Sequence, residues 1–422
     1  MAVFLTELDP RARIKGSRDG LGAQPVWSAM GRPLIGNLTT VTTDLAAFTT
    51  LLVGLRLTEI GPAEDDAQRQ AAFLVWEQMA GYVRHVVYDD RGFFGRQRIA
   101  ARAASAGSNG GKVRLSADPA YQILSNQKTD GLLGNYTAPA RASGLLAPGS
   151  PARLTPQAAA FVDATYLPRL AAAWGRDAQQ LTRALTQASY GFDLRENSKR
   201  AAVAAVLDPT LSAKERDFYR RHLIEGGPLD PTKGRQARLA MLVAARPRPS
   251  DGPLGIYVAQ LAEDAELQGW ADVGERLRRI VMCESVLAPA TVLFSYLLGR
   301  DDAHVDTVIE DLHAVWGDRL ESVHPQAAAV LSDRQWRDIA DALVQGDWRR
   351  LIHVLAQRNA TVMRERGGGL AWLEVTDGDR LRVRFRDEPT GLPAADEIRD
   401  LWWYPYFLPS LIRLVAANEE SA

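Results

Sequence analysis

Apolar residues recur at helical spacing along most of this 422-residue chain. Near the beginning, the polar residues 42–44 precede Leu45, Phe48, Leu52 and Leu55, which are three or four positions apart. A polar cap followed by such a stripe predicts a helix. After a Gly-Pro break and an acidic first turn, the same spacing predicts the next helix, with its inward face formed by Ala72, Trp76, Met79, Val83 and Val87.

Two shorter helices are predicted within the stretch from Asp118 to Leu170. Pro119 is tolerated in a first helical turn, and the apolar stripe after it predicts a helix that runs to Gly131. A second helix is predicted over residues 135–143, because Gly144 supplies the left-handed cap that ends it. We therefore expect a helix, a turn and a second helix.

A hairpin and a third helix are predicted to follow. The pairs Leu145-Leu146 and Arg153-Leu154 flank a Pro-Gly-Ser-Pro turn, which predicts a tight hairpin. Thr155-Pro156 then combines an N-cap with a proline at the first helical position. Because helix, turn, helix, hairpin, helix is the order of a winged helix, the segment predicts a small module that grips nucleic acid.

The one clear β element is predicted near the end of the chain, where two segments alternate in character. Residues 371–376 and 380–386 flank Asp377-Gly378, which favours the positive φ angles of a tight turn and so predicts a β-hairpin. Four arginines at every second position project from one face of the hairpin: Arg380, Arg382, Arg384 and Arg386. They form either a solvated face of a hairpin packed on helices or a second ridge that contacts phosphates.

The sequence therefore predicts a mainly α, multi-helical protein with a winged-helix-like module and a small C-terminal β-hairpin. Proline and glycine in residues 246–253 interrupt helix on both sides and predict a linker. The expected parts are an N-terminal helical region with a basic flank (1–115), the winged-helix-like module (116–175), a helical connector (176–248) and a C-terminal helical domain (254–422) that carries the hairpin (371–386).

Charge is distributed unevenly along the chain. The formal net charge is -1, yet residues 84–153 contain ten Lys and Arg against four Asp and Glu. A local basic field in a near-neutral protein favours contact with a polyanion, and duplex DNA is the expected ligand. Tyr136, Thr137 and Arg141 are expected on the outward face of the second short helix, which would read the bases. The full set of expected nucleic-acid-binding residues is Arg96, Arg98, Arg102, Lys112, Arg114, Lys128, Tyr136, Thr137, Arg141 and Arg153.

Residues with the spacing of a catalytic centre are missing. Gly110-Gly111-Lys112 resembles a phosphate-binding loop, but Ala106 replaces its glycine and Val113 its hydroxyl residue. The single cysteine, Cys283, excludes a disulfide framework and a thiolate zinc cage, and the histidines have no metalloprotease spacing. The acidic residues among 301–311 share a helix face that either gathers a divalent ion or is merely solvated. We predict no enzymatic activity, no cofactor and no metal.

A cytoplasmic location is expected. Charged residues interrupt the first fifteen positions, so no apolar core of signal-peptide length is present there. The apolar run over residues 281–298 contains Glu284 and Pro289, which predicts a buried helix rather than a membrane span. One cysteine in a chain of this length fits a reducing compartment.

Several short motifs resemble poorly characterised bacterial proteins encoded in multi-gene antiviral-defence loci. They are Arg18-Asp19-Gly20-Leu21-Gly22 followed by Trp27, Gly36-Asn37-Leu38-Thr39-Thr40-Val41-Thr42, Gly144-Leu145-Leu146 to Leu154-Thr155, and Tyr404-x-Tyr406-Phe407-x-x-Ser410-Leu411. The resemblance implies a helical, non-catalytic partner of a helicase, ATPase or nuclease encoded nearby. Two functions are thus expected as alternatives: a DNA-binding or DNA-sensing component of a multiprotein system, or a helical scaffold that uses the winged fold for protein contact.

Overall fold

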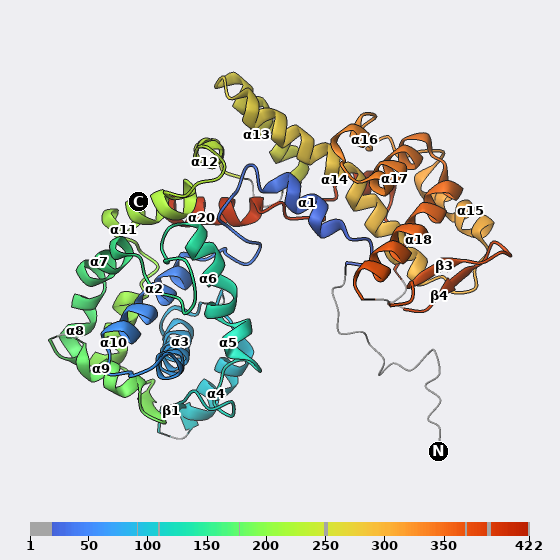
Figure 1. Ribbon diagram of the computed structural model, residues 1–422. Coiled ribbons are helices and arrows are strands. Elements are labelled where there is room, and N and C mark those ends of the chain that lie inside the picture. Colours follow the sequence, from blue (N-terminus) through green and yellow to red (C-terminus); the bar gives the residue numbers. More distant parts are fainter. Residues whose placement is uncertain are drawn as a thin grey trace, which may run out of the picture. The chain divides into compact units, whose positions relative to one another are not determined.

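The computed structural model describes residues 19–90, 92–108, 110–176, 178–248, 252–367, 369–385 and 390–420. These residues form a mainly helical protein, as predicted, with two small two-stranded sheets, of which only the C-terminal one was expected (Figure 1). The chain divides into two compact units, which are described separately. Unit 1 combines the residues up to Leu34 with residues 248–406, and unit 2 combines residues 35–247 with the residues from Phe407 onward.

Unit 2 is organised around the long helix α3. Its side chains from Ala72 to Arg84 are buried, and α2, α4, α9 and α10 pack against it. Gly54 of α2 permits the closest approach, since a Cβ there would lie 2.4 Å from the Trp76 ring. The elements of unit 2 are α2 (Leu45–Ile60), α3 (Asp66–Tyr88), α4 (Arg96–Ser108), β1 (Lys112–Leu115), α5 (Gln127–Asp130), α6 (Leu132–Ala142), α7 (Pro156–Thr165), α8 (Leu167–Trp174), α9 (Gln179–Leu185), β2 (Tyr190–Asp193), α10 (Ser198–Val206), α11 (Ala213–Tyr219), the π-helical turn η2 (Arg220–Ile224), α12 (Arg235–Ala245) and α20 (Leu408–Glu420).

The predicted helix caps of unit 2 are confirmed. The carboxylate of Asp44 accepts a hydrogen bond from Ala46 N at the beginning of α2, and Asp65 caps α3 in the same way. Such caps satisfy amide groups that a helix leaves unpaired at its first turn. The C-terminal helix α20 belongs to this unit as well, because it packs on α12 and η2 and Ser410 Oγ donates to the carbonyl of Thr39.

The winged-helix module is not confirmed as a whole, because its predicted first helix is wrong. Only the four-residue α5 lies in the stretch from Pro119 to Gly131. The side chain of Gln122 instead bonds to the backbone at Ala117 and Gln127, and the carboxylate of Asp118 accepts from Ala120 N. Side chains that bond the local backbone in this way compete with helix formation.

The other parts of the predicted module are present. The second helix is α6, and Gly144 follows it with a φ of 72°. Leu146 and Leu154 form an antiparallel bridge across the proline-rich turn, which makes residues 145–154 a hairpin-like connection. Thr155 caps α7 with its hydroxyl group, and Pro156 is the first residue of that helix.

Unit 1 is organised around α14, most of whose apolar residues are buried. Among the described helices it alone is long and apolar enough to cross a membrane, but 72% of its apolar window is buried inside the protein, as expected for a core helix. The elements of unit 1 are α1 (Ala23–Gly31), α13 (Leu254–Leu267), α14 (Ala271–Leu298), α15 (Val305–Trp316), α16 (Ala327–Val330), α17 (Arg334–Gln345), α18 (Trp348–Glu365), β3 (Leu373–Val375), β4 (Leu381–Val383) and α19 (Ala395–Asp400).

The first described residues are tied to the distant part of unit 1. Asp19 caps α1 by accepting hydrogen bonds from two amides of its first turn. Asn359 and Arg358 of α18 donate to the carbonyls of Gly20 and Leu21, at 2.9 Å each. A division of the chain into consecutive domains does not anticipate that the first described residues pack with α18. The expected domain boundaries at residues 115 and 175 both lie inside unit 2.

The predicted C-terminal hairpin is confirmed. Strands β3 and β4 pair antiparallel with Glu374 opposite Arg382. Arg384 bonds Glu374 at 2.8 Å and Arg380 bonds Asp302 at 2.8 Å, whereas Arg386 lies outside the described residues. Because two of the arginines are paired with nearby carboxylates, the arrangement favours a solvated face over a phosphate ridge.

Glu284 of α14 binds the aromatic segment that precedes α20. Its carboxylate accepts hydrogen bonds from the amides of Trp403 and Tyr404 and from the Tyr406 hydroxyl at 2.8 Å. Burial raises the pKa of Glu284 to about 7, although these hydrogen bonds lower it. The three hydrogen bonds hold the backbone of residues 403–406 in place. In this segment Tyr406 has a φ of 46°, a conformation that non-glycine residues rarely adopt.

Candidate nucleic-acid interface

A groove of about 640 Å³ lies in unit 2. Its walls are formed by α2, α3, α5, α6 and the turn of the hairpin-like connection 145–154. Four cationic side chains line it, each from a different segment, together with the carboxylate of Asp66: they are Arg69, Lys128, Arg141 and Arg153. The groove also has hydroxyl groups and an apolar part, contributed by Thr58, Thr129, Thr137, Ser150, Leu55, Phe73, Leu133 and Pro151.

Asp66 positions two of the four cations. It lies in the first turn of α3, where it bonds Arg69 one turn later at 2.9 Å. It also bonds Arg153 of the hairpin-like connection at 2.7 Å. Ion pairs this exposed contribute little to stability, so their main effect is to fix where the guanidinium groups lie.

Arg141 occupies the last turn of α6. Its Nη2 donates to the carbonyl of Gly149 at 2.6 Å, which connects the helix to the proline-rich turn. The Nε atoms of Arg141 and Arg69 are buried and have no hydrogen-bond partner among the described residues. An unsatisfied buried donor costs roughly 1–3 kcal/mol.

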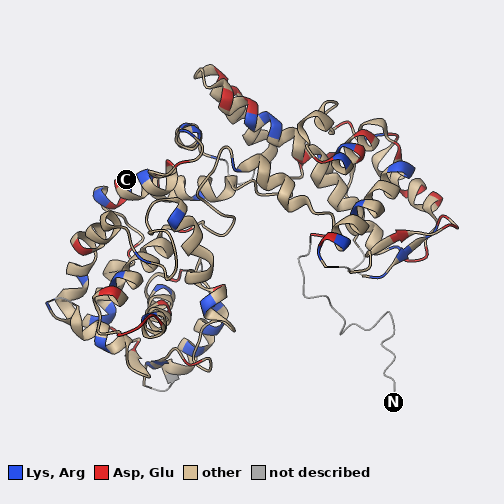
Figure 2. Ribbon diagram, viewed as in Figure 1, with Lys and Arg blue, Asp and Glu red and all other residues tan. Residues whose placement is uncertain are grey.

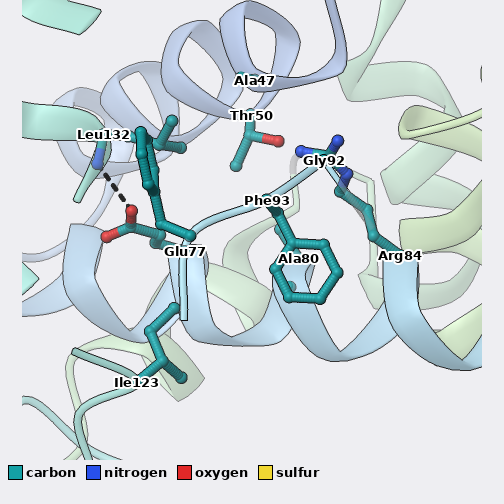
Figure 3. Close-up of a pocket in the computed structure, with 11 residues that line it drawn as sticks. Ala47, Thr50, Glu77, Ala80, Arg84, Gly92, Phe93, Ile123 and Leu132 are labelled. Atoms are coloured by element: carbon teal, nitrogen blue, oxygen red, sulfur yellow. Dashed lines mark hydrogen bonds between the residues drawn. The ribbon is translucent and has the colours of Figure 1, made fainter. Parts of the chain in front are cut away.

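Glu77 of α3 anchors the two short helices that carry part of the groove. Its carboxylate accepts from Leu132 N at the beginning of α6 at 2.7 Å (Figure 3). It also accepts from Gln127 Nε2 at the beginning of α5 at 2.8 Å. Burial raises the pKa of Glu77 to about 7, against the effect of these two hydrogen bonds. One buried carboxyl group therefore contacts the beginnings of both α5 and α6.

A cavity of about 20 Å³ adjoins this carboxyl group. It extends along α3 from Glu77 to Arg84, two turns further on, and Phe93 lies beside it (Figure 3). Arg84 is buried and paired with Asp44 and Asp90. The volume is sufficient for a single water molecule next to Glu77.

Gln127 completes the attachment of α5. Its amide also donates to the carbonyl of Leu74 at 3.0 Å, and its oxygen accepts from Gln78 Nε2 at 3.2 Å. The neighbouring Lys128 is exposed and lines the groove. A four-residue helix with no stability of its own is thus held in place by buried hydrogen bonds to α3.

The structure brings together four of the ten predicted nucleic-acid-binding residues in this groove: Lys128, Thr137, Arg141 and Arg153. Thr137 also donates to the carbonyl of Leu133 in its own helix at 2.5 Å. Arg69 was missed by the sequence analysis, because it precedes the basic stretch and lies in a turn recognised only for its acidic residues. No local signal identifies it, since its place in the groove depends on the fold.

Five further predicted residues lie on α4 and β1, where Figure 2 shows Lys and Arg in blue. Arg98 donates to the carbonyl of Gln122, and Arg102 to those of Tyr121 and Ala120. Arg114 lies 4.7 Å from the centre of the Tyr121 ring and donates to its hydroxyl. These three arginines therefore hold the loop before α5. The other two residues of the group, Arg96 and Lys112, are exposed and make no such bond to that loop among the described residues.

The predicted outward position of Tyr136 is wrong. The residue is buried, its hydroxyl donates to the carbonyl of Val41 at 2.9 Å, and its ring packs edge-on against Phe48. An aromatic ring of this size stabilises more by burial than it would on an exposed helix face. Tyr136 thus attaches α6 to α2 and contributes nothing to the surface.

Among the described residues, no group of three or more His, Cys, Asp and Glu side chains has the arrangement of a metal site. The acidic residues near position 304 have cationic partners instead. Asp302 pairs with Arg380, and Asp306 pairs with Arg349. This arrangement favours the solvated reading of that helix face.

Comparisons of the chain with protein-family models, with curated proteins and with solved structures found no match. The groove must therefore be interpreted from its own chemistry.

Proposed function

We propose that this protein is a non-catalytic, DNA-binding or DNA-sensing component of a multiprotein bacterial antiviral-defence system. The observation that carries the proposal is the convergence of Arg69, Lys128, Arg141 and Arg153 on one groove. Four cations from four segments form a local positive field in a chain with a formal net charge of -1. Such a field suits a phosphate backbone.

The arginine geometry adds to this argument. Guanidinium groups bind phosphate oxygens through several N–H donors at once. Three of the four cations that line the groove are arginines: Arg69, Arg141 and Arg153. Activity on the bound nucleic acid would come from a helicase, ATPase or nuclease partner in the cytoplasm, as the motif resemblance implies.

Charge reversal in the groove tests the proposal. Arg141→Glu and Arg153→Glu should each weaken binding of labelled DNA about tenfold in fluorescence anisotropy at low salt, because each replaces an attractive contact with a repulsive one. Arg183→Glu is the matched control, since Arg183 is exposed on α9 and does not line the groove. Unchanged affinity in both groove variants, with wild-type thermal stability, would contradict the proposal.

A scaffold function is the second candidate. Arg98, Arg102 and Arg114 bond within the protein, and this observation favours a basic flank that serves structure. If the scaffold reading holds, the purified protein binds neither single-stranded nor duplex nucleic acid at 50 mM salt. Its partner would then be retained by the protein after nuclease treatment.

A further inference from the structure

We infer that the groove of unit 2 takes a single nucleic-acid strand in preference to a duplex. This inference rests on the proposed function and specifies its ligand. It concerns the groove lined by the four cations, not the basic surface of α4 and β1.

The shape of the site distinguishes the two ligands. Proteins that read duplex DNA place a helix or a pair of strands into a groove of the DNA, so the protein surface projects. Here the cations line a hollow of about 640 Å³, a volume in the range of pockets that enclose small ligands. A flexible strand can enter such a hollow, whereas the rigid cylinder of a duplex can only rest on its rim.

The helix expected to read DNA bases is not available for insertion. Tyr136 is buried against α2, and Thr137 bonds to its own helix. Arg141 is turned toward the proline-rich turn, where it bonds the carbonyl of Gly149. The polar side of α6 therefore forms a wall of the hollow and not a projecting ridge.

The walls match the two parts of a nucleotide. Phosphate groups would meet the guanidinium groups of Arg69, Arg141 and Arg153, which line the groove. Bases would meet its apolar part, where Leu133 is half-buried and Pro151 is exposed. Phe73 is buried, so no exposed ring is offered for stacking, and we expect weak sequence preference together with strong dependence on salt.

The test compares two probes on the full chain. A labelled oligothymidylate and a duplex of the same length are titrated by anisotropy between 50 and 200 mM salt. The single strand should bind at least tenfold more tightly. With four cations in contact, the slope of log affinity against log salt should reach about -3, because each phosphate contact to a single strand contributes about -0.7.

Two conservative variants locate the binding. Arg69→Gln and Arg141→Gln should each reduce the magnitude of the salt slope by about 0.7 for the single strand. Arg183→Gln on α9 should leave it unchanged, and circular dichroism melting verifies that all three variants fold.

Each other result has a definite meaning. If the duplex binds as tightly as the single strand or more tightly, and the groove variants weaken that binding, the single-strand inference is overturned and the proposed function stands. An absence of binding to both probes would overturn both. Single-strand binding that responds equally to Arg183→Gln and the groove variants would show that the groove is not the site, and it too would overturn the inference.

Discussion

Both units bury a glutamate of their central long helix, Glu77 on α3 and Glu284 on α14. In each case burial raises the pKa to about 7, and both carboxylate oxygens accept hydrogen bonds. Placing an ionisable group in the interior has a desolvation cost. Each glutamate must therefore hold a part of the structure that apolar packing alone does not hold.

The two carboxyl groups fix different things. Glu284 accepts from two consecutive backbone amides and a tyrosine hydroxyl, and it holds an irregular segment. Glu77 accepts from one backbone amide and one side-chain amide, and the helices it anchors line the basic groove. A small cavity also adjoins Glu77. The comparison indicates that Glu284 fixes an irregular segment in unit 1, whereas Glu77 fixes helices that form walls of the basic groove in unit 2.

The largest expected effect is that of Glu284→Ala. The variant leaves two backbone amides and the Tyr406 hydroxyl without an acceptor, at roughly 1–3 kcal/mol for each buried donor. Chemical denaturation should show a loss of about 5 kcal/mol in the free energy of unfolding. A loss below about 1 kcal/mol would mean that the aromatic segment is held by packing alone. DNA affinity of the folded fraction should be unchanged.

The pH dependence of stability is the next largest effect. A carboxyl group whose pKa rises on folding binds more protons in the folded state, so its contribution is fully present below about pH 4.5 and is lost as pH rises through about 7. Each group accounts for at most about 3 kcal/mol across that window. Glu77→Gln and Glu284→Gln cannot ionise, and each should flatten the profile measured by thermal melting. An unaltered slope in both would contradict the assignment.

The smallest effect on stability is expected from Glu77→Ala. This variant is also the most direct test of the functional difference between the two glutamates. Water entering the adjoining cavity can satisfy Leu132 N, so we expect a loss of only about 2 kcal/mol. Because α5 and α6 lose their common anchor, nucleic-acid affinity should fall several-fold. Anisotropy of Glu77→Ala beside Glu284→Ala checks the contrast. If both variants lose affinity equally, the functional distinction between the two anchors disappears.

Local sequence signals predicted much of the fold. The caps of α2, α3 and α7 and the β3–β4 hairpin were confirmed, because each depends on residues that are neighbours in the chain. The predicted helix from Pro119 was wrong, because the side chains of Asp118 and Gln122 bond the local backbone. The four residues that do form a helix, α5, are attached through Gln127 to Glu77, fifty residues earlier. Pattern alone gives no indication of such a distant partner.

The candidate site was predictable only in part. Charge counting identified Lys128, Arg141 and Arg153, which the structure gathers in one groove. Charge counting missed Arg69, which comes from α3. The predicted outward face of the second short helix included Tyr136, which is buried. The composition of a segment gives the number of cations in it. A groove depends on which of these cations the fold brings together, and composition does not give this.

The division of the chain into interleaved units affects the order in which the protein can be completed during synthesis. The ribosome releases the first helix of unit 1, then nearly all of unit 2, and only then the remainder of unit 1. The last helix, α20, returns to unit 2, where it packs on α12 and η2. Neither unit can therefore be completed until a segment that is synthesised much later has been made. Neither unit corresponds to a single uninterrupted stretch of coding sequence. Truncation before residue 407 would leave unit 2 without the helix that covers α12.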